Sequence, residues 1–91
     1  MDFEWDPQKA DSNLRKHGVS FHEAASVLGD ALSITYHDPE HSVTEHRFIT
    51  VGMSRLGRML MVAHTDRGDN MRIISARRMT RQERKQYEEG K

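Results

Sequence analysis

The chain has 91 residues, the length of one small domain, and its 14 Lys and Arg side chains balance its 14 Asp and Glu side chains. It contains no cysteine, which excludes disulfide frameworks and thiolate metal sites. The acidic beginning, Met1–Asp6, lacks the apolar stretch of a secretory signal, and the longest apolar run, Met59–Ala63, is far too short to span a membrane. We therefore expect a cytoplasmic protein without membrane contact.

A short strand and a helix are predicted at the beginning of the chain. Phe3–Trp5 alternates apolar and acidic residues, as a strand does. Asp6 followed by proline is typical of an N-cap with proline at the first helical position, so a helix should run from about Pro7 to His17. Gly18 suits the left-handed residue that ends such a helix.

A second helix is predicted over about Phe21–Leu28. Ser20 and Glu23 have the spacing of a capping box, and Gly29 suits the end of the helix. Because only a couple of residues separate the two helices, they should cross as a tight hairpin. One face of the second helix is apolar and is formed by Phe21, Ala24, Ala25 and Leu28.

Four strands and a third helix should follow. The strand candidates are 31–36, 45–53, 58–65 and 71–78, and turn-forming residues dominate the connections at 37–44, 54–57 and 66–70. Short connections favour an antiparallel meander, whose third strand is nearly all apolar at its centre and is expected to be buried on both faces. A capping box at Thr80 and Glu83 opens a helix over about 81–89, which Gly90 ends. The predicted fold class is α+β, with helices packed on one face of the sheet.

The balanced charge conceals a division of the chain. Residues 1–45 carry 3 basic and 9 acidic side chains, a net charge of −6, whereas residues 46–91 carry 11 basic and 5 acidic ones, a net charge of +6. Ten of the basic residues are arginine, whose planar guanidinium binds phosphate in a bidentate way. Two interpretations stay open: contact with an anionic partner, or a solvated basic surface that offsets the acidic half.

The first helix carries a polar stripe that we single out as a candidate site. Lys9, Asn13, Lys16 and His17 recur at i, i+4, i+7 and i+8, which aligns them along the helix. An imidazole there has the chemistry of a general base. The alternative is a solvated face on which Lys16 and His17 complement the helix dipole.

The last strand is the second candidate. Strict alternation places Arg72, Ile74, Ala76 and Arg78 on one face and Met71, Ile73, Ser75 and Arg77 on the other. Arg77 and Arg78 lie just before the third helix, so both guanidiniums and the free N–H groups of that helix could bind the same phosphate. The alternative is a pair of rim arginines bonded to acids such as Glu45 or Glu83.

The histidine-rich loop around His37–His46 is a weaker candidate. Its histidines and carboxylates are ligand types that zinc accepts, but their spacing matches no metal motif and Pro39 excludes a helical arrangement. We therefore predict no metal and no cofactor. His64 lies in an apolar strand and is expected to be a hydrogen-bonded core or edge residue. Nucleophile, phosphate-loop and dinucleotide motifs are absent from the sequence.

Several short motifs together resemble the BrnT toxin family over nearly the whole chain. They are Phe3–Asp6, Lys9, Asn13, Lys16–Phe21 with Glu23 and Ala24, Glu45–Arg47 followed by Gly52, and Arg72–Arg77 with Glu83 and Tyr87. The motifs occur in the family's order and at compatible spacing. One departure is Arg78-Met79, where the family usually has Lys-Ala; this keeps the charge but changes its geometry.

The resemblance implies a RelE-like ribonuclease fold and the role of toxin in a bacterial type II toxin–antitoxin module. Such a toxin cleaves RNA and inhibits translation. The implied partner is a BrnA-like ribbon-helix-helix antitoxin, and operator DNA is contacted only through the complex. The family's candidate active-site positions correspond to Lys16, His17, Glu45, Arg47, Arg77 and Arg78. We expect further RNA contacts from Lys9, Asn13, Arg67, Arg72 and Arg81.

Two other functions stay open from the residues alone. The domain could be a non-catalytic protein-binding module whose acidic half docks a basic partner and whose arginine-rich surface touches RNA. An operator-binding repressor is less well supported, because no helix-turn-helix or ribbon pattern is present.

Overall fold

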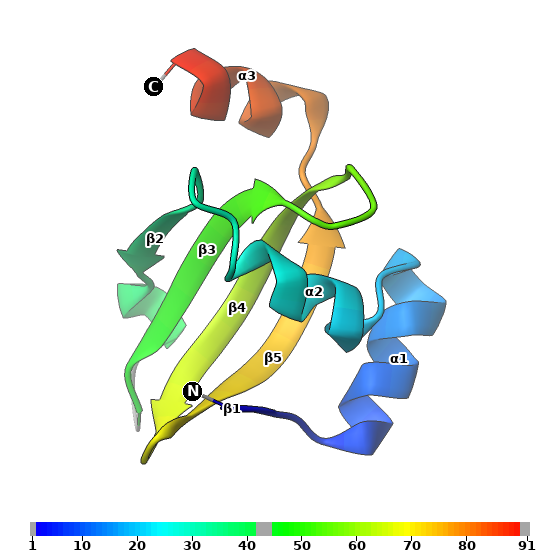
Figure 1. The fold of residues 1–91 in the computed structure, drawn as a ribbon, viewed down its shortest axis with the longest axis vertical. Helices are drawn as coiled ribbons and strands as arrows, with labels where there is room; N and C mark the ends of the chain where they lie inside the picture. The colour runs from blue at the N-terminus through cyan, green and yellow to red at the C-terminus, as the bar shows by residue number, and fades with distance from the viewer. Residues whose placement is uncertain (1, 42–44, 90–91) are drawn as a thin grey trace.

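The computed structural model describes residues 2–41 and 45–89 and has the predicted α+β class (Figure 1). In chain order the elements are β1 (Asp2–Glu4), α1 (Pro7–His17), α2 (Phe21–Val27), β2 (Ile34–His37), a 3₁₀ turn (Pro39–His41), β3 (Arg47–Met53), β4 (Met59–Arg67), β5 (Asn70–Arg78) and α3 (Arg81–Glu89). One sheet has the strand order β1-β5-β4-β3-β2. The described residues include no helix that is both long and apolar enough to cross a membrane.

The local signals at both ends of α1 place it where the sequence predicts. The Asp6 carboxylate accepts a hydrogen bond from the Gln8 N–H at 2.8 Å, and Gly18 ends the helix in the left-handed conformation with φ of 68°. At α2 the Ser20 hydroxyl accepts from the Glu23 N–H at 3.0 Å, as the capping box requires. The predicted end of α2 is one residue too long, because Leu28 is its C-cap.

The four-strand meander from β2 to β5 is confirmed, with differences at the strand ends. The turn between β4 and β5 contains only Gly68 and Asp69, since the ladder continues to the pair of Arg67 and Asn70. The predicted stretches 42–44 and 90 lie outside the described residues. The one parallel contact among the described strands joins β1 to β5, and it pairs segments about seventy residues apart that no local signal connects.

The core lies between the sheet and the two N-terminal helices, which cover a single face (Figure 1). Its buried apolar residues are Val19, Phe21, Ala24, Val27, Leu60, Val62, Ile73 and Ala76. On β4, Leu60 and Val62 are fully buried but Met61 and Ala63 on the opposite face are only half-buried. The expectation that β4 is buried on both faces is therefore wrong: its second face is partly open.

A β-bulge at Ile74 changes which side chains of β5 share a face. Ser75 pairs with Ala63 and Ile73 pairs with His64, so Ile74 has no partner on β4. Strict alternation is therefore wrong across the bulge, and Ile73 and Ala76 both face the helices. Arg77 and Arg72 consequently lie on the open face together, whereas alternation places them on opposite faces. Arg78 pairs with Leu60 and lies on the helix face.

Helix α3 lies beyond the ends of the strands rather than on the helix-covered face (Figure 1), so the expectation that the helices share one face holds only for α1 and α2. None of its described residues is buried. Hydrogen bonds between described residues connect it to the rest of the molecule: Arg77 donates to Glu83, and the Tyr87 hydroxyl donates to the Leu32 carbonyl at 2.7 Å. Glu83, Gln86 and Tyr87 of this helix also border a pocket whose other lining residues are Ile34, Tyr36, Val51, Met61 and Met79.

Candidate active site

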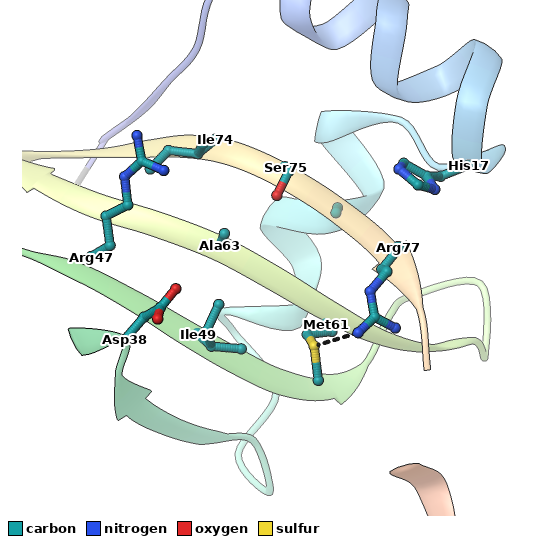
Figure 2. Close-up of a pocket in the computed structure, with 10 residues that line it drawn as sticks. His17, Asp38, Arg47, Ile49, Met61, Ala63, Ile74, Ser75 and Arg77 are labelled. Carbon is teal, nitrogen blue, oxygen red and sulfur yellow. Dashed lines mark hydrogen bonds between the residues drawn. The ribbon is translucent and has the colours of Figure 1, made fainter. Parts of the chain in front are cut away.

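A pocket of about 270 Å³ on the open face of the sheet collects three of the predicted site residues (Figure 2). His17 comes from the end of α1, Arg47 from the start of β3 and Arg77 from the end of β5. The remaining lining consists of Asp38, Ile49, Met61, Ala63, Ile74, Ser75 and Ala76. Two guanidiniums, an imidazole and a carboxylate therefore surround a largely apolar floor.

Asn13 brings the end of α1 to this pocket. Its side-chain amide accepts a hydrogen bond from the Ala76 N–H at 3.1 Å and donates to the Ala76 carbonyl at 2.8 Å. It also donates to the Val19 carbonyl at 3.0 Å. The amide thus satisfies a backbone edge of β5 as a neighbouring strand would. His17 follows one helical turn later on the same side of α1, which places its imidazole over β5 near Arg77.

This arrangement gives Asn13 a role different from the expected RNA contact. The residue is buried, and both ends of its amide are bonded to the backbone. We therefore no longer expect Asn13 to contact phosphate. Its amide instead fixes α1 against β5. The polar stripe of α1 accordingly divides into one structural residue and the exposed side chains of Lys9, Lys16 and His17.

Arg77 is held in one orientation by Glu83. Its Nη1 and Nη2 atoms donate to the two carboxylate oxygens of Glu83 at 2.8 and 2.9 Å. This bidentate bond lowers the pKa of Glu83 from 4.5 to about 2, with help from the Thr80 N–H, and raises the pKa of Arg77 further. Arg77 is thus a rim arginine bonded to an acid, which was one of the two interpretations of the sequence. It nevertheless lines the pocket.

Arg47 and Asp38 form the opposite side of the pocket (Figure 2). The Asp38 N–H donates to the Arg47 carbonyl at 2.8 Å, which continues the pairing with β3 one residue beyond the end of β2. Arg47 Nε lies 3.8 Å from a carboxylate oxygen of Glu45. Glu45 is exposed beside Arg47 and does not line the pocket.

A second, smaller pocket adjoins the first along α1. Lys9, Ser12, Asn13 and Lys16 line it, and it shares His17, Ile74 and Ser75 with the main pocket. The two pockets therefore form one continuous surface on which Lys16 neighbours His17. Because His17 lines both pockets, the Lys16-His17 segment and Arg77 border the same surface.

The remaining predicted arginines lie away from the two pockets. Arg78 projects from the helix face at the end of β5, and Arg81 begins α3. Arg67 is exposed at the far end of β4, and half-buried Arg72 lies on the open face opposite Thr65. Of these, Arg72 shares the face of the candidate site, whereas Arg78 points from the opposite face.

The histidines outside the pocket form no clear metal centre. His37 Nε2 and His46 Nδ1 are 3.4 Å apart, but residues 2–41 and 45–89 contain no group of three or more metal-ligating side chains. His64 is buried, and its Nε2 shares a hydrogen bond of 2.7 Å with the Thr50 hydroxyl, as expected for a core residue. Burial lowers the pKa of His64, which favours its neutral form.

The sequence pattern misses two polar lining residues, Asp38 and Ser75, and the floor of the pocket. Asp38 reads as a loop residue because it precedes proline, yet it borders the pocket beside Arg47. Ile49, Met61 and Ala63 lie on adjacent strands of the open face, with Ile49 directly opposite Ala63. Period-two alternation in these strands is the signal that identifies the floor, once the helices are known to cover the other face.

Comparison with known proteins gives a family and a fold. A family model described as the ribonuclease toxin BrnT of type II toxin–antitoxin systems matches residues 5–83. The crystal structure of the Brucella abortus ribonuclease toxin BrnT is similar, with a TM-score of 0.66 and 21% sequence identity, over 89% of this chain and 99% of that one. A comparison with curated proteins found no match. Because the family model covers most of the sequence, this chain belongs to the BrnT family of ribonuclease toxins of type II toxin–antitoxin systems.

Proposed function

We propose that this chain is a metal-independent endoribonuclease that cleaves RNA in the pocket on the open face of the sheet. The observation that carries the proposal is the meeting of His17, Arg47 and Arg77, from three distant segments, around one cavity. Guanidiniums suit a phosphodiester, and the imidazole suits proton transfer. Positive charge from two arginines takes the place that a metal ion has in other nucleases.

The proposed reaction begins at the ribose 2′-hydroxyl. His17 withdraws its proton, the 2′-oxygen bonds to the adjacent phosphorus, and the bond from phosphorus to the 5′-oxygen breaks. The 5′-oxygen receives a proton from water, and the other product ends in a 2′,3′-cyclic phosphate. Arg77 and Arg47 stabilise the charge that develops on the phosphate oxygens, for which one well-placed donor is typically worth about 10²–10³ in rate. We favour His17 over Glu45 as the base, since only His17 lines the pocket.

The surroundings of the pocket suggest how the RNA strand extends from it. Lys9 and Lys16 border the adjoining pocket on one side, and Arg72 lies further along the open face. Contacts from these cations to phosphates are electrostatic, so RNA affinity should fall steeply as salt is raised. Arg67, Arg78 and Arg81 lie farther from the pockets, and we assign them at most outer contacts.

We further propose that cleavage takes place in the bacterial cytoplasm, inhibits translation and is blocked by an antitoxin of the ribbon-helix-helix class. Membership of a type II toxin family supports the existence of such a partner. Operator DNA would be contacted through the complex. A non-catalytic binding module is the alternative, and tight stoichiometric binding to a small neighbouring gene product without RNA cleavage would favour it.

The test is to incubate the purified chain with RNA in EDTA and compare it with Arg77→Ala and Lys16→Ala. Arg84→Ala serves as the control, because Arg84 is exposed on α3 and lines neither pocket. We expect cleavage by the wild type and the control, and a loss of roughly 10²–10³-fold for Arg77→Ala. Full cleavage by both site variants would refute the site, and loss of wild-type cleavage in EDTA would refute metal independence.

A further inference from the structure

The bond between Arg77 and Glu83 leaves one edge of the guanidinium facing the pocket. Glu83 occupies the end of the guanidinium, where Nη1 and Nη2 each donate one hydrogen. The second Nη1 hydrogen is directed to the Arg78 carbonyl at 3.2 Å. The edge formed by Nε and Nη2 then remains, and Nη2 donates a hydrogen bond of 3.2 Å from this edge to the Met61 sulfur. Figure 2 shows this contact on the pocket floor.

A thioether is a weak hydrogen-bond acceptor, so a phosphate oxygen would replace it readily. The edge of Nε–H and Nη2–H is one of the two on which arginine binds an oxyanion in bidentate fashion. With Glu83 on the other edge, Arg77 can bind phosphate without releasing its carboxylate partner. The ion pair therefore does not exclude Arg77 from the site but determines which edge it presents.

The Glu83 carboxylate is itself held in place by the first turn of α3. One of its oxygens accepts a hydrogen bond from the Thr80 N–H at 2.8 Å, and the Glu83 N–H donates to the Thr80 hydroxyl at 3.1 Å. This capping box fixes the carboxylate relative to the backbone that follows Arg78. The guanidinium of Arg77 thus has a partner whose own position is determined.

We propose that Glu83 is a positioning residue for RNA cleavage, which holds the Nε–Nη2 edge of Arg77 toward the scissile phosphate. The inference rests on the proposed function and adds to it a residue that does not line the main pocket. Glu83 acts through Arg77 and needs no contact with RNA. Without it, the long side chain of Arg77 samples several rotamers, and the productive one becomes a minor population.

Glu83→Gln is the appropriate variant, because an amide oxygen still accepts from Thr80 and keeps the capping box. We expect kcat for RNA cleavage to fall roughly 10- to 100-fold. KM should stay constant or decrease, since removal of the carboxylate leaves more net positive charge near the RNA. The matched control is Glu88→Gln, which removes the same charge from an exposed position of α3 and should cleave like the wild type.

A double-mutant cycle separates positioning from a general structural effect. In an Arg77→Ala background, Glu83→Gln should have no further effect on kcat, because its target is absent. An unchanged kcat for Glu83→Gln alone, or an equal loss in both backgrounds, would overturn the proposal. If the wild type fails to cleave RNA, or if Arg77→Ala cleaves normally, the proposed function fails instead.

NMR can test, without a cleavage assay, whether Glu83 orients the guanidinium of Arg77. The ¹⁵N–¹H NMR signal of Arg77 Nε should be sharp in the wild type and in Glu88→Gln, and should broaden or average in Glu83→Gln. Addition of an uncleavable 2′-deoxy dinucleotide should shift this signal in the wild type. A signal that is equally sharp in Glu83→Gln would show that the carboxylate does not orient Arg77, whether or not the chain cleaves RNA.

Discussion

Replacing Asn13 by aspartate tests whether α1 is fixed to β5 by a single side chain. The substitution keeps the shape but turns the donor nitrogen into an acceptor oxygen, which then faces the carbonyls of Ala76 at 2.8 Å and Val19 at 3.0 Å. Two hydrogen bonds are lost at about 1 kcal/mol each, and a carboxylate is buried between oxygens. We expect a total loss of roughly 3–5 kcal/mol in the free energy of unfolding, a large share of the stability of a small domain.

Chemical denaturation monitored by the single tryptophan, Trp5, measures this loss. Asp11→Asn makes the opposite exchange at an exposed position of the same helix and should change stability by less than about 0.5 kcal/mol. The deficit of Asn13→Asp relative to wild type should shrink in acid, because a protonated carboxyl can donate again. A denaturation midpoint equal to that of the wild type at neutral pH would refute the assigned role of Asn13.

Three further predictions concern stability and binding. Gly52→Ala should lower the free energy of unfolding by roughly 1–3 kcal/mol, because the added Cβ would lie 2.9 Å from the Ser33 Cβ. Gly29→Ala should change this free energy little, and equal denaturation midpoints for the two variants would contradict the prediction. The Arg58 guanidinium, paired with Glu23, holds the pKa of that carboxyl below 4.5, and Arg77 lowers the pKa of Glu83 to about 2. The stability that both carboxylates contribute is therefore present above pH 4.5 and declines as the pH falls below it. A denaturation midpoint that stays constant over that range would contradict the ion pairs. The logarithm of the RNA association constant should fall linearly with the logarithm of the salt concentration. An association constant that does not change with salt would exclude phosphate contacts as the main source of RNA affinity.

The elements with strong local signals are the ones that sequence reasoning locates well. The cap at Asp6 and the glycine at position 18 define α1 to the residue, and the capping box at Thr80 and Glu83 does the same for α3 over its described residues. Such caps act over three or four residues, so they are visible without any tertiary information. The strand β1 is different, because its partner β5 lies at the other end of the chain.

Three of the six predicted catalytic residues, His17, Arg47 and Arg77, line the pocket, but the geometry of the site was not predictable from the sequence. The bulge at Ile74 shifts the alternation of β5 by one residue, and nothing in a run of apolar and basic residues announces that shift. Asn13 belongs to a helical stripe of polar residues, and periodicity cannot separate a buried amide from exposed cations. Both facts depend on how α1 packs against β5, which is a tertiary property.

The most direct test of the central claim uses one ribo-oligonucleotide and a copy with a 2′-deoxy sugar at the cleaved position, under single-turnover conditions in EDTA. We expect the chain to bind both with similar affinity, because the guanidiniums of Arg47 and Arg77 recognise the phosphate, and to cleave only the ribo form. The ribo product should end in a 2′,3′-cyclic phosphate. Cleavage of the deoxy copy at the same rate would contradict attack by the 2′-oxygen and with it the proposed chemistry of this pocket.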